Sequence, residues 1–169
     1  PNGETEYNAE SPDESAFVKF AAKNGHVLIE RQPNIVTLEV NGQQVEYDII
    51  SLLPFDSDRK RMTIAVREKG KEEIIVFTKG ADNIIYERST KILYEEEVNK
   101  YALAGYRTLV FSKRVLTPEE SENWIKEFTE ANTKIEGRDE AISQISSIIE
   151  SKLEIVGVSA VEDKLQPKI

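Results

Sequence analysis

The segment from residue 53 to residue 83, LPFDSDRKRMTIAVREKGKEEIIVFTKGADN, decides the fold. It contains two short runs of β-branched and apolar residues, 62–66 (MTIAV) and 74–78 (IIVFT), which are joined by a charged turn around Gly70. Apolar runs bounded by glycine and charge clusters are typical of β-strands. The segment is therefore predicted to form a hairpin, with a helix over residues 81–88 directly after it.

Chemically distinctive residues stand at both open ends of this hairpin: Phe55, Arg59, Lys60 and Arg61 before it, and Lys79 and Gly80 after it. An aromatic face can stack on a nucleobase for roughly 1–3 kcal/mol. Ammonium and guanidinium groups complement phosphate, and a glycine lets a ligand approach the backbone. The group predicts a nucleotide pocket. The alternative is structural: a core phenylalanine, a solvated charged turn and an ordinary strand end.

The composition is that of a soluble globular domain: 169 residues, 39% hydrophobic and 31% charged. The net charge of −9 argues against a nucleic-acid partner. The absence of cysteine excludes disulfides and thiolate metal sites. No apolar run approaches the ~20 residues that a membrane-spanning helix needs. The chain lacks an initiator methionine and is expected to be part of a larger parent protein, to which any membrane role would belong.

Helix and strand patterns alternate irregularly along the rest of the chain. Ser11-Pro12-Asp13-Glu14 predicts a helix start, with Ser11 as N-cap and Glu14 closing a capping box. Asn41-Gly42 predicts a type I′ hairpin turn. Further strands are expected at 27–30, 35–40, 45–53, 108–112 and 153–161, and further helices at 92–103, from Thr117, and at 139–152. The frequent hairpins indicate an α/β fold of the α+β type, a twisted, mostly antiparallel sheet flanked by helices.

Two parts of the central segment, 54–62 (PFDSDRKRM) and 77–83 (FTKGADN), resemble the nucleotide-binding (N) domain of P-type ATPases. Three further motifs keep the family's order: 10–14 (ESPDE), 105–109 (GYRTL) and 160–166 (AVEDKLQ). Together they cover nearly the whole chain. The first and last of the three resemble the phospholipid-translocating branch, the flippases, more than the cation pumps, which carry Asp-Pro-Pro-Arg at the last position.

The resemblance implies an N domain over residues 1–152, and a return strand and hinge over 153–169 that lead to an absent phosphorylation domain. The parent would be an enzyme, a phospholipid-transporting P-type ATPase at the cytosolic face of a membrane. Its phosphorylation, actuator and transmembrane domains would be the partners of this domain, and phospholipid would be reached only through the parent.

Seven nucleotide-contacting residues are implied: Glu14, Phe55, Ser57, Lys60, Lys79, Gly80 and Arg107. Phe55 would stack on adenine, Glu14 would accept from the adenine amino group, and Lys79 would line the pocket near base and sugar. Arg107 would reach the phosphates, and Gly80 would keep the adjoining wall low. Lys60 would flank the pocket, and Ser57 would add a polar contact where the cation pumps have an arginine.

The chain has neither a G-x-x-x-x-G-K-[ST] nor a G-x-G-x-x-G phosphate loop. It also lacks the family's Asp-Lys-Thr-Gly-Thr and Gly-Asp-Gly-x-Asn-Asp motifs, so no catalytic residue and no metal ligand is predicted. We expect it to bind ATP, as Mg-ATP in the parent, without hydrolysing it, with a dissociation constant of roughly 0.1–1 mM. Two alternatives stay open, the N domain of a cation-transporting pump and a non-catalytic interaction module on the same fold.

Overall fold

The computed structural model describes residues 11–162, in which seven strands form one sheet in sequence order, each antiparallel to its neighbours. The strands are β1 His26–Arg31, β2 Ile35–Val40, β3 Gln43–Leu53, β4 Arg61–Glu68, β5 Ile74–Gly80, β6 Arg107–Val115 and β7 Glu154–Val161. The helices are α1 Pro12–Lys23, α2 Asp82–Glu87, α3 Glu95–Leu103, α4 Pro118–Asn132 and α5 Arg138–Ile149. The predicted α/β fold, an antiparallel sheet with flanking helices, is confirmed.

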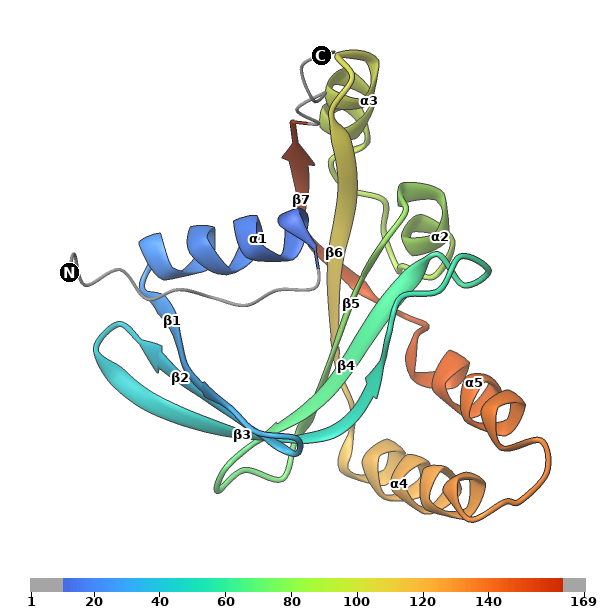
Figure 1. Cartoon of the computed structure of the whole chain (residues 1–169). Helices are drawn as coiled ribbons and strands as arrows, with labels where there is room; N and C mark the ends of the chain where they lie inside the picture. The colour runs from blue at the N-terminus through green and yellow to red at the C-terminus, as the bar shows by residue number, and fades with distance from the viewer. Residues whose placement is uncertain (1–10, 163–169) are drawn as a thin grey trace, which may run out of the picture.

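The sheet is strongly curled, and the helices divide between its two sides (Figure 1). Helix α1 lies inside the curve, whereas α2, α4 and α5 lie on the outer side. The predicted central hairpin is β4–β5, in which Arg61 pairs with Gly80 and Arg67 with Ile74. The β2–β3 turn also forms as predicted, with φ of 50° at Asn41 and 85° at Gly42.

The core lies between the sheet and its outer helices, because alternate strand residues point to that side. One buried cluster joins β4, β5, α4 and the end of α5: Ala65, Ile74, Val76, Leu116, Trp124 and Ile149. A second cluster packs α2 and α3 against β6 and β7: Ile85, Val98, Val110 and Ile155. Trp124 is therefore a core residue, as the sequence pattern indicates.

Capping contacts fix the start of α4. The Thr117 backbone N–H donates to Glu120 Oε2 at 2.9 Å, and the Glu120 N–H donates to Thr117 Oγ1 at 3.1 Å. The hydrogen bond from the Thr117 backbone lowers the pKa of Glu120, and Arg114 adds to this shift. At α1 only half of the predicted box forms. Ser11 Oγ accepts from the Glu14 N–H at 3.3 Å, but the Glu14 carboxylate is bound elsewhere, to Lys79.

The predicted helix at 92–103 begins three residues late. Tyr94 has a left-handed φ of 64°, which interrupts helical geometry, and α3 starts at Glu95. The strand expected at 153–161 is present as β7, which pairs with β6. Of the segment 153–169 predicted as return strand and hinge, residues 163–169 lie outside the described part of the chain. Within residues 11–162 no helix combines the length and apolarity that a membrane span requires.

Candidate functional site

A cavity of about 290 Å³ lies on the inner face of the sheet, next to the start of α1. Its apolar lining comes from five strands: Leu52, Met62, Ile64, Phe77, Phe111 and Val156. These side chains share one face because the register places them opposite one another, as with Ile64 and Phe77. Two charged residues, Glu14 and Lys79, and two small polar residues, Thr78 and Ser112, complete the wall.

Glu14 and Lys79 form an ion pair across this cavity. The pair joins the first turn of α1 to β5, and Ser11 and Pro12 set the position of that turn. The Lys79 ammonium also lies over the Phe17 ring, 5.1 Å from its centroid, where a cation–π attraction operates. The cavity therefore offers an apolar floor with one carboxylate and one ammonium in its wall.

Arg107 stands at the start of β6, and its Nη2 donates to Asp13 Oδ1 at 2.7 Å. Its side chain is half exposed. The first turn of α1 thus holds two of the three predicted cations, because Asp13 binds Arg107 and its neighbour Glu14 binds Lys79. An anionic ligand that uses either cation must compete with these carboxylates.

Gly80 is buried at the end of β5, beside the start of β4. A Cβ atom there would lie 2.5 Å from the Lys60 carbonyl oxygen and 2.9 Å from Arg61 Cβ. The same carbonyl accepts from the Ala81 N–H at 3.1 Å. Lys60 itself has a left-handed φ of 52°. The absence of a side chain at residue 80 is thus required by the close approach of the neighbouring strand's backbone.

Phe55 and Ser57 lie on the loop at residues 54–60, which connects β3 to β4 beside Gly80. Asp56 orders this loop, since its Oδ1 accepts from the Asp58 N–H at 2.8 Å and from the Arg59 N–H at 2.7 Å. Phe55 is 60% exposed. It is not among the residues that line the cavity, so the structure brings Glu14 and Lys79 together and leaves Phe55, Ser57 and Lys60 on the adjoining loop.

The predicted cationic cluster at residues 59–61 is wrong for two of its three members. Arg59 and Arg61 both bind the carboxylate of Glu150, which is fully buried after α5. Only Lys60 remains exposed. The sequence around Glu150 contains an indication of this burial. A carboxylate at a helix C-terminus faces the negative end of the helix dipole, so its presence in the apolar segment 148–150 indicates a cationic partner.

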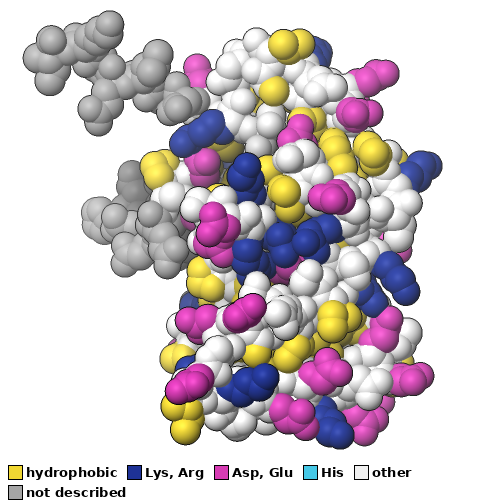
Figure 2. All heavy atoms as spheres, turned by 90° about the vertical axis from the view of Figure 1, so that its right-hand side faces the viewer, with side chains coloured by type: hydrophobic (Ala, Val, Ile, Leu, Met, Phe, Trp, Pro, Cys, Tyr) yellow, Lys and Arg dark blue, Asp and Glu magenta, His cyan; other side chains and the backbone are white. Residues whose placement is uncertain are grey.

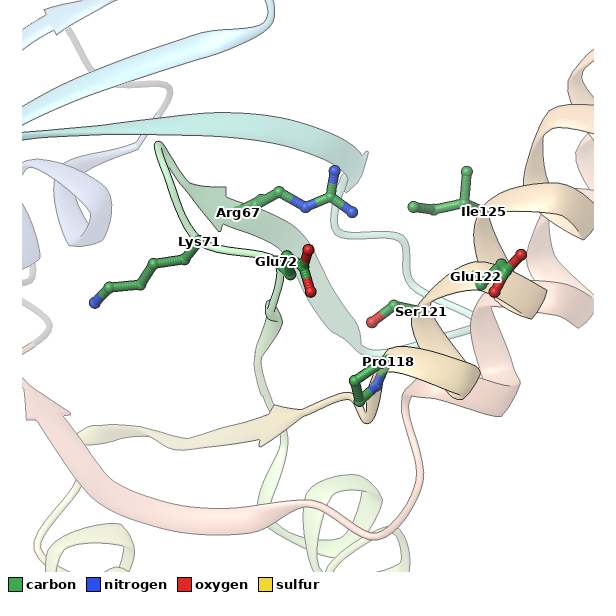
Figure 3. A pocket seen from close by; sticks show the side chains of 7 residues that line it. All are labelled: Arg67, Lys71, Glu72, Pro118, Ser121, Glu122 and Ile125. Carbon is green, nitrogen blue, oxygen red and sulfur yellow. The ribbon is translucent and has the colours of Figure 1, made fainter.

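A second hollow, of about 420 Å³, lies between the β4–β5 turn and the start of α4 (Figure 3). It contains none of the predicted site residues, and its cations, Arg67 and Lys71, are offset by Glu72 and Glu122. None of the described residues that line it carries an aromatic ring. Among residues 11–162, no group of three or more His, Asp or Glu side chains is placed to hold a metal ion.

Comparison with known proteins agrees with the motif pattern. The family described as P-type ATPase, cytoplasmic domain N matches residues 2–168. Phospholipid-transporting ATPase IC of Xenopus tropicalis is 36% identical over 99% of this chain and 14% of its own length. Probable phospholipid-transporting ATPase 4 of Arabidopsis thaliana is 42% identical over 97% of the chain and 14% of its own length. Phospholipid-transporting ATPase tat-1 of Caenorhabditis elegans is 37% identical over 98% and 15% respectively.

The chain thus spans 14–15% of the length of these relatives. The resemblance to the phospholipid-translocating branch is confirmed, because all three relatives are phospholipid-transporting ATPases. The chain belongs to the P-type ATPases and corresponds to their cytoplasmic N domain.

Proposed function

We propose that this chain binds ATP and is the nucleotide-binding domain of a phospholipid-transporting P-type ATPase at the cytosolic face of a membrane. The observation that carries the proposal is the cavity on the inner face of the sheet, where Glu14 and Lys79 stand in a mostly apolar wall next to the loop of the exposed Phe55. A mostly apolar cavity with a few polar groups suits a heterocyclic base better than a phosphate chain.

The residues present fit ATP in named roles. Phe55 would stack on the base, Glu14 would accept from its amino group, and Lys79 would contact base and sugar. Arg107, half exposed at the start of β6, would contact the phosphates. The loop residues Ser57 and Lys60 would flank the site. Gly80, which has no side chain, would let the Lys60 backbone pack directly against β5.

In the whole enzyme this domain would bind Mg-ATP and present the γ-phosphate to a catalytic aspartate in a neighbouring domain. Its contribution to catalysis would then be positioning and charge neutralisation. Residues 1–152 would form the N domain, and residues 153–169 would lead to the phosphorylation domain. The actuator and transmembrane domains would complete the parent, in which the phospholipid is moved.

Calorimetric titration of the 169-residue chain with ATP, ADP, AMP and GTP tests the proposal. ATP is expected to bind at roughly 0.1–1 mM, with ADP and AMP within a few-fold, because most contacts are to base and sugar. GTP is expected to bind more weakly. Where adenine has an amino donor, guanine has the acceptor O6, which would face the Glu14 carboxylate without a hydrogen bond. Absence of heat at several millimolar ATP would instead favour the non-catalytic interaction module.

Asp13→Asn is expected to tighten ATP binding by about 1.5- to 5-fold, because an exposed ion pair of about 0.2–1 kcal/mol no longer competes for Arg107. Adenosine, which has no phosphate, should bind with unchanged affinity. Calorimetry at low salt measures both. The matched control is Asp139→Asn, which removes the same charge from the first turn of α5. Equal effects of the two variants on ATP affinity would contradict a specific role for the Asp13–Arg107 pair.

A further inference from the structure

Glu150 is the most deeply buried charged group among the described residues, with 0% of its surface exposed. It directly follows α5, on the outer face of the sheet and so on the opposite side from the cavity. Burial of a carboxylate is stabilised only by charge pairing and hydrogen bonds. Its partners therefore show what it holds in place.

All three side-chain partners of the Glu150 carboxylate come from the chain just after Phe55. Oε2 accepts from Arg61 Nε at 2.7 Å, and Oε1 accepts from Thr63 Oγ1 at 2.7 Å and from the Arg59 guanidinium. Arg61 Nη1 also donates to the Arg59 carbonyl at 3.1 Å. One carboxylate thus ties the end of the Phe55 loop and the start of β4 to α5.

The two arginines stand on either side of Lys60, the residue with the left-handed backbone. The Lys60 carbonyl is the group that accepts from Ala81 and packs on Gly80. A second branch reaches β5, because Thr63 Oγ1 lies 2.9 Å from Thr78 Oγ1, and Thr78 precedes Lys79. Glu150 is therefore connected to two of the segments that carry predicted nucleotide contacts, the Phe55 loop and β5.

We propose that Glu150 is a positioning residue for nucleotide binding, which holds the Phe55 loop in its binding geometry from the opposite face of the sheet. The proposal rests on the proposed function. It assigns Glu150 no contact with the nucleotide.

The negative charge of Glu150, more than the volume of its side chain, keeps the surrounding arginines together. Arg88 joins the cluster, since its Nη1 donates to the Glu150 carbonyl at 3.2 Å. Burial lowers the pKa of Arg88, and the nearby charge of Arg61 lowers it further. Figure 2 shows Lys and Arg side chains gathered in the middle of this face. Without Glu150, three guanidinium groups would face one another with no carboxylate between them, and the two on the loop and β4 would move apart.

A double-mutant cycle in the 169-residue chain tests the proposal. Glu150→Gln is expected to weaken ATP and adenosine binding equally, by about 3- to 10-fold. In the Phe55→Ala background the same change should weaken binding by less than about 2-fold, because the ring that Glu150 positions is gone. The control is Glu120→Gln, which breaks the Arg114–Glu120 pair, neither member of which lines the cavity, and should leave ATP affinity unchanged.

Two results would overturn the proposal: unchanged ATP affinity in Glu150→Gln, or equal effects of Glu150→Gln with and without Phe55. If Glu150→Gln does not fold, Thr63→Val removes one partner of Glu150 without leaving a charge unpaired. It is expected to act in the same direction with a smaller effect, and unchanged affinity of that variant would overturn the proposal as well.

Amide hydrogen exchange without nucleotide separates this inference from the proposed function. Loss of protection at residues 58–60 in Glu150→Gln, with protection kept in Glu120→Gln, supports the positioning role. Retained protection in both overturns it. Failure of the unmodified chain to bind ATP would refute the proposed function, while this exchange measurement would still decide whether Glu150 holds the loop.

Discussion

Gly80→Ala is expected to lower the free energy of unfolding by about 1–3 kcal/mol, the usual range for overpacking a filled site. The added Cβ would meet the Lys60 carbonyl oxygen at 2.5 Å and the Arg61 backbone at 3.0 Å. Both neighbours are held in place, one by the Ala81 N–H and the other by Glu150. β4 and β5 must therefore separate at Gly80, where the end of the Phe55 loop contacts β5. Because this displaces the loop, ATP affinity should fall as well.

Chemical denaturation and calorimetry with ATP measure the two effects of Gly80→Ala. The matched control is Gly157→Ala in β7, where a Cβ atom would meet nothing within 4 Å. That variant should keep both stability and ATP affinity. Wild-type stability of Gly80→Ala would contradict a close contact of β4 and β5 at this residue.

Phe55→Ala is expected to weaken ATP binding by about 1–3 kcal/mol, which corresponds to about 5- to 150-fold. The ring is 60% exposed, so its removal should change the unfolding free energy little. AMP should lose the same factor as ATP, because the lost contact is to the base. Calorimetry with both nucleotides measures this.

Phe20→Ala is the matched control for Phe55→Ala, since Phe20 is 70% exposed on α1 and does not line the cavity. It should leave ATP affinity unchanged. Equal affinity of Phe55→Ala and the unmodified chain would remove the stacking role and leave the cavity beside Lys79 as the base site.

The parts of the fold that depend on local sequence could be predicted. The Asn41-Gly42 turn follows from the left-handed backbone that this dipeptide tolerates, and the start of α4 follows from the Thr117 capping box. Short connections make β1 to β5 neighbours in the sheet, whereas β5 and β6, and β6 and β7, pair across two intervening helices each, and local sequence does not predict those two pairings. The late start of α3 could not be predicted, because the apolar pattern of 92–103 is helical and only the left-handed Tyr94 interrupts it.

The contacts around the site depend on residues far apart in sequence, and these could not be predicted. From local sequence, Arg59 and Arg61 are expected to form a solvated or phosphate-binding cluster. In the folded chain both bind Glu150, which is 91 and 89 residues away. Glu14 has a local partner in the Ser11 cap, yet its carboxylate binds Lys79, 65 residues away. Local hydrogen bonds compete with such ion pairs, and only the folded sheet decides between them.

Titration of the ¹⁵N-labelled chain with ATP, followed by amide chemical shifts, determines whether Phe55 and Lys79 belong to one ATP site. Signals of Glu14, Phe55, Lys79 and Arg107 are expected to shift together and saturate with one dissociation constant. This expectation would be contradicted by shifts confined to the hollow at Arg67 and Ser121, or by saturating ATP binding that leaves both Phe55 and Lys79 unchanged.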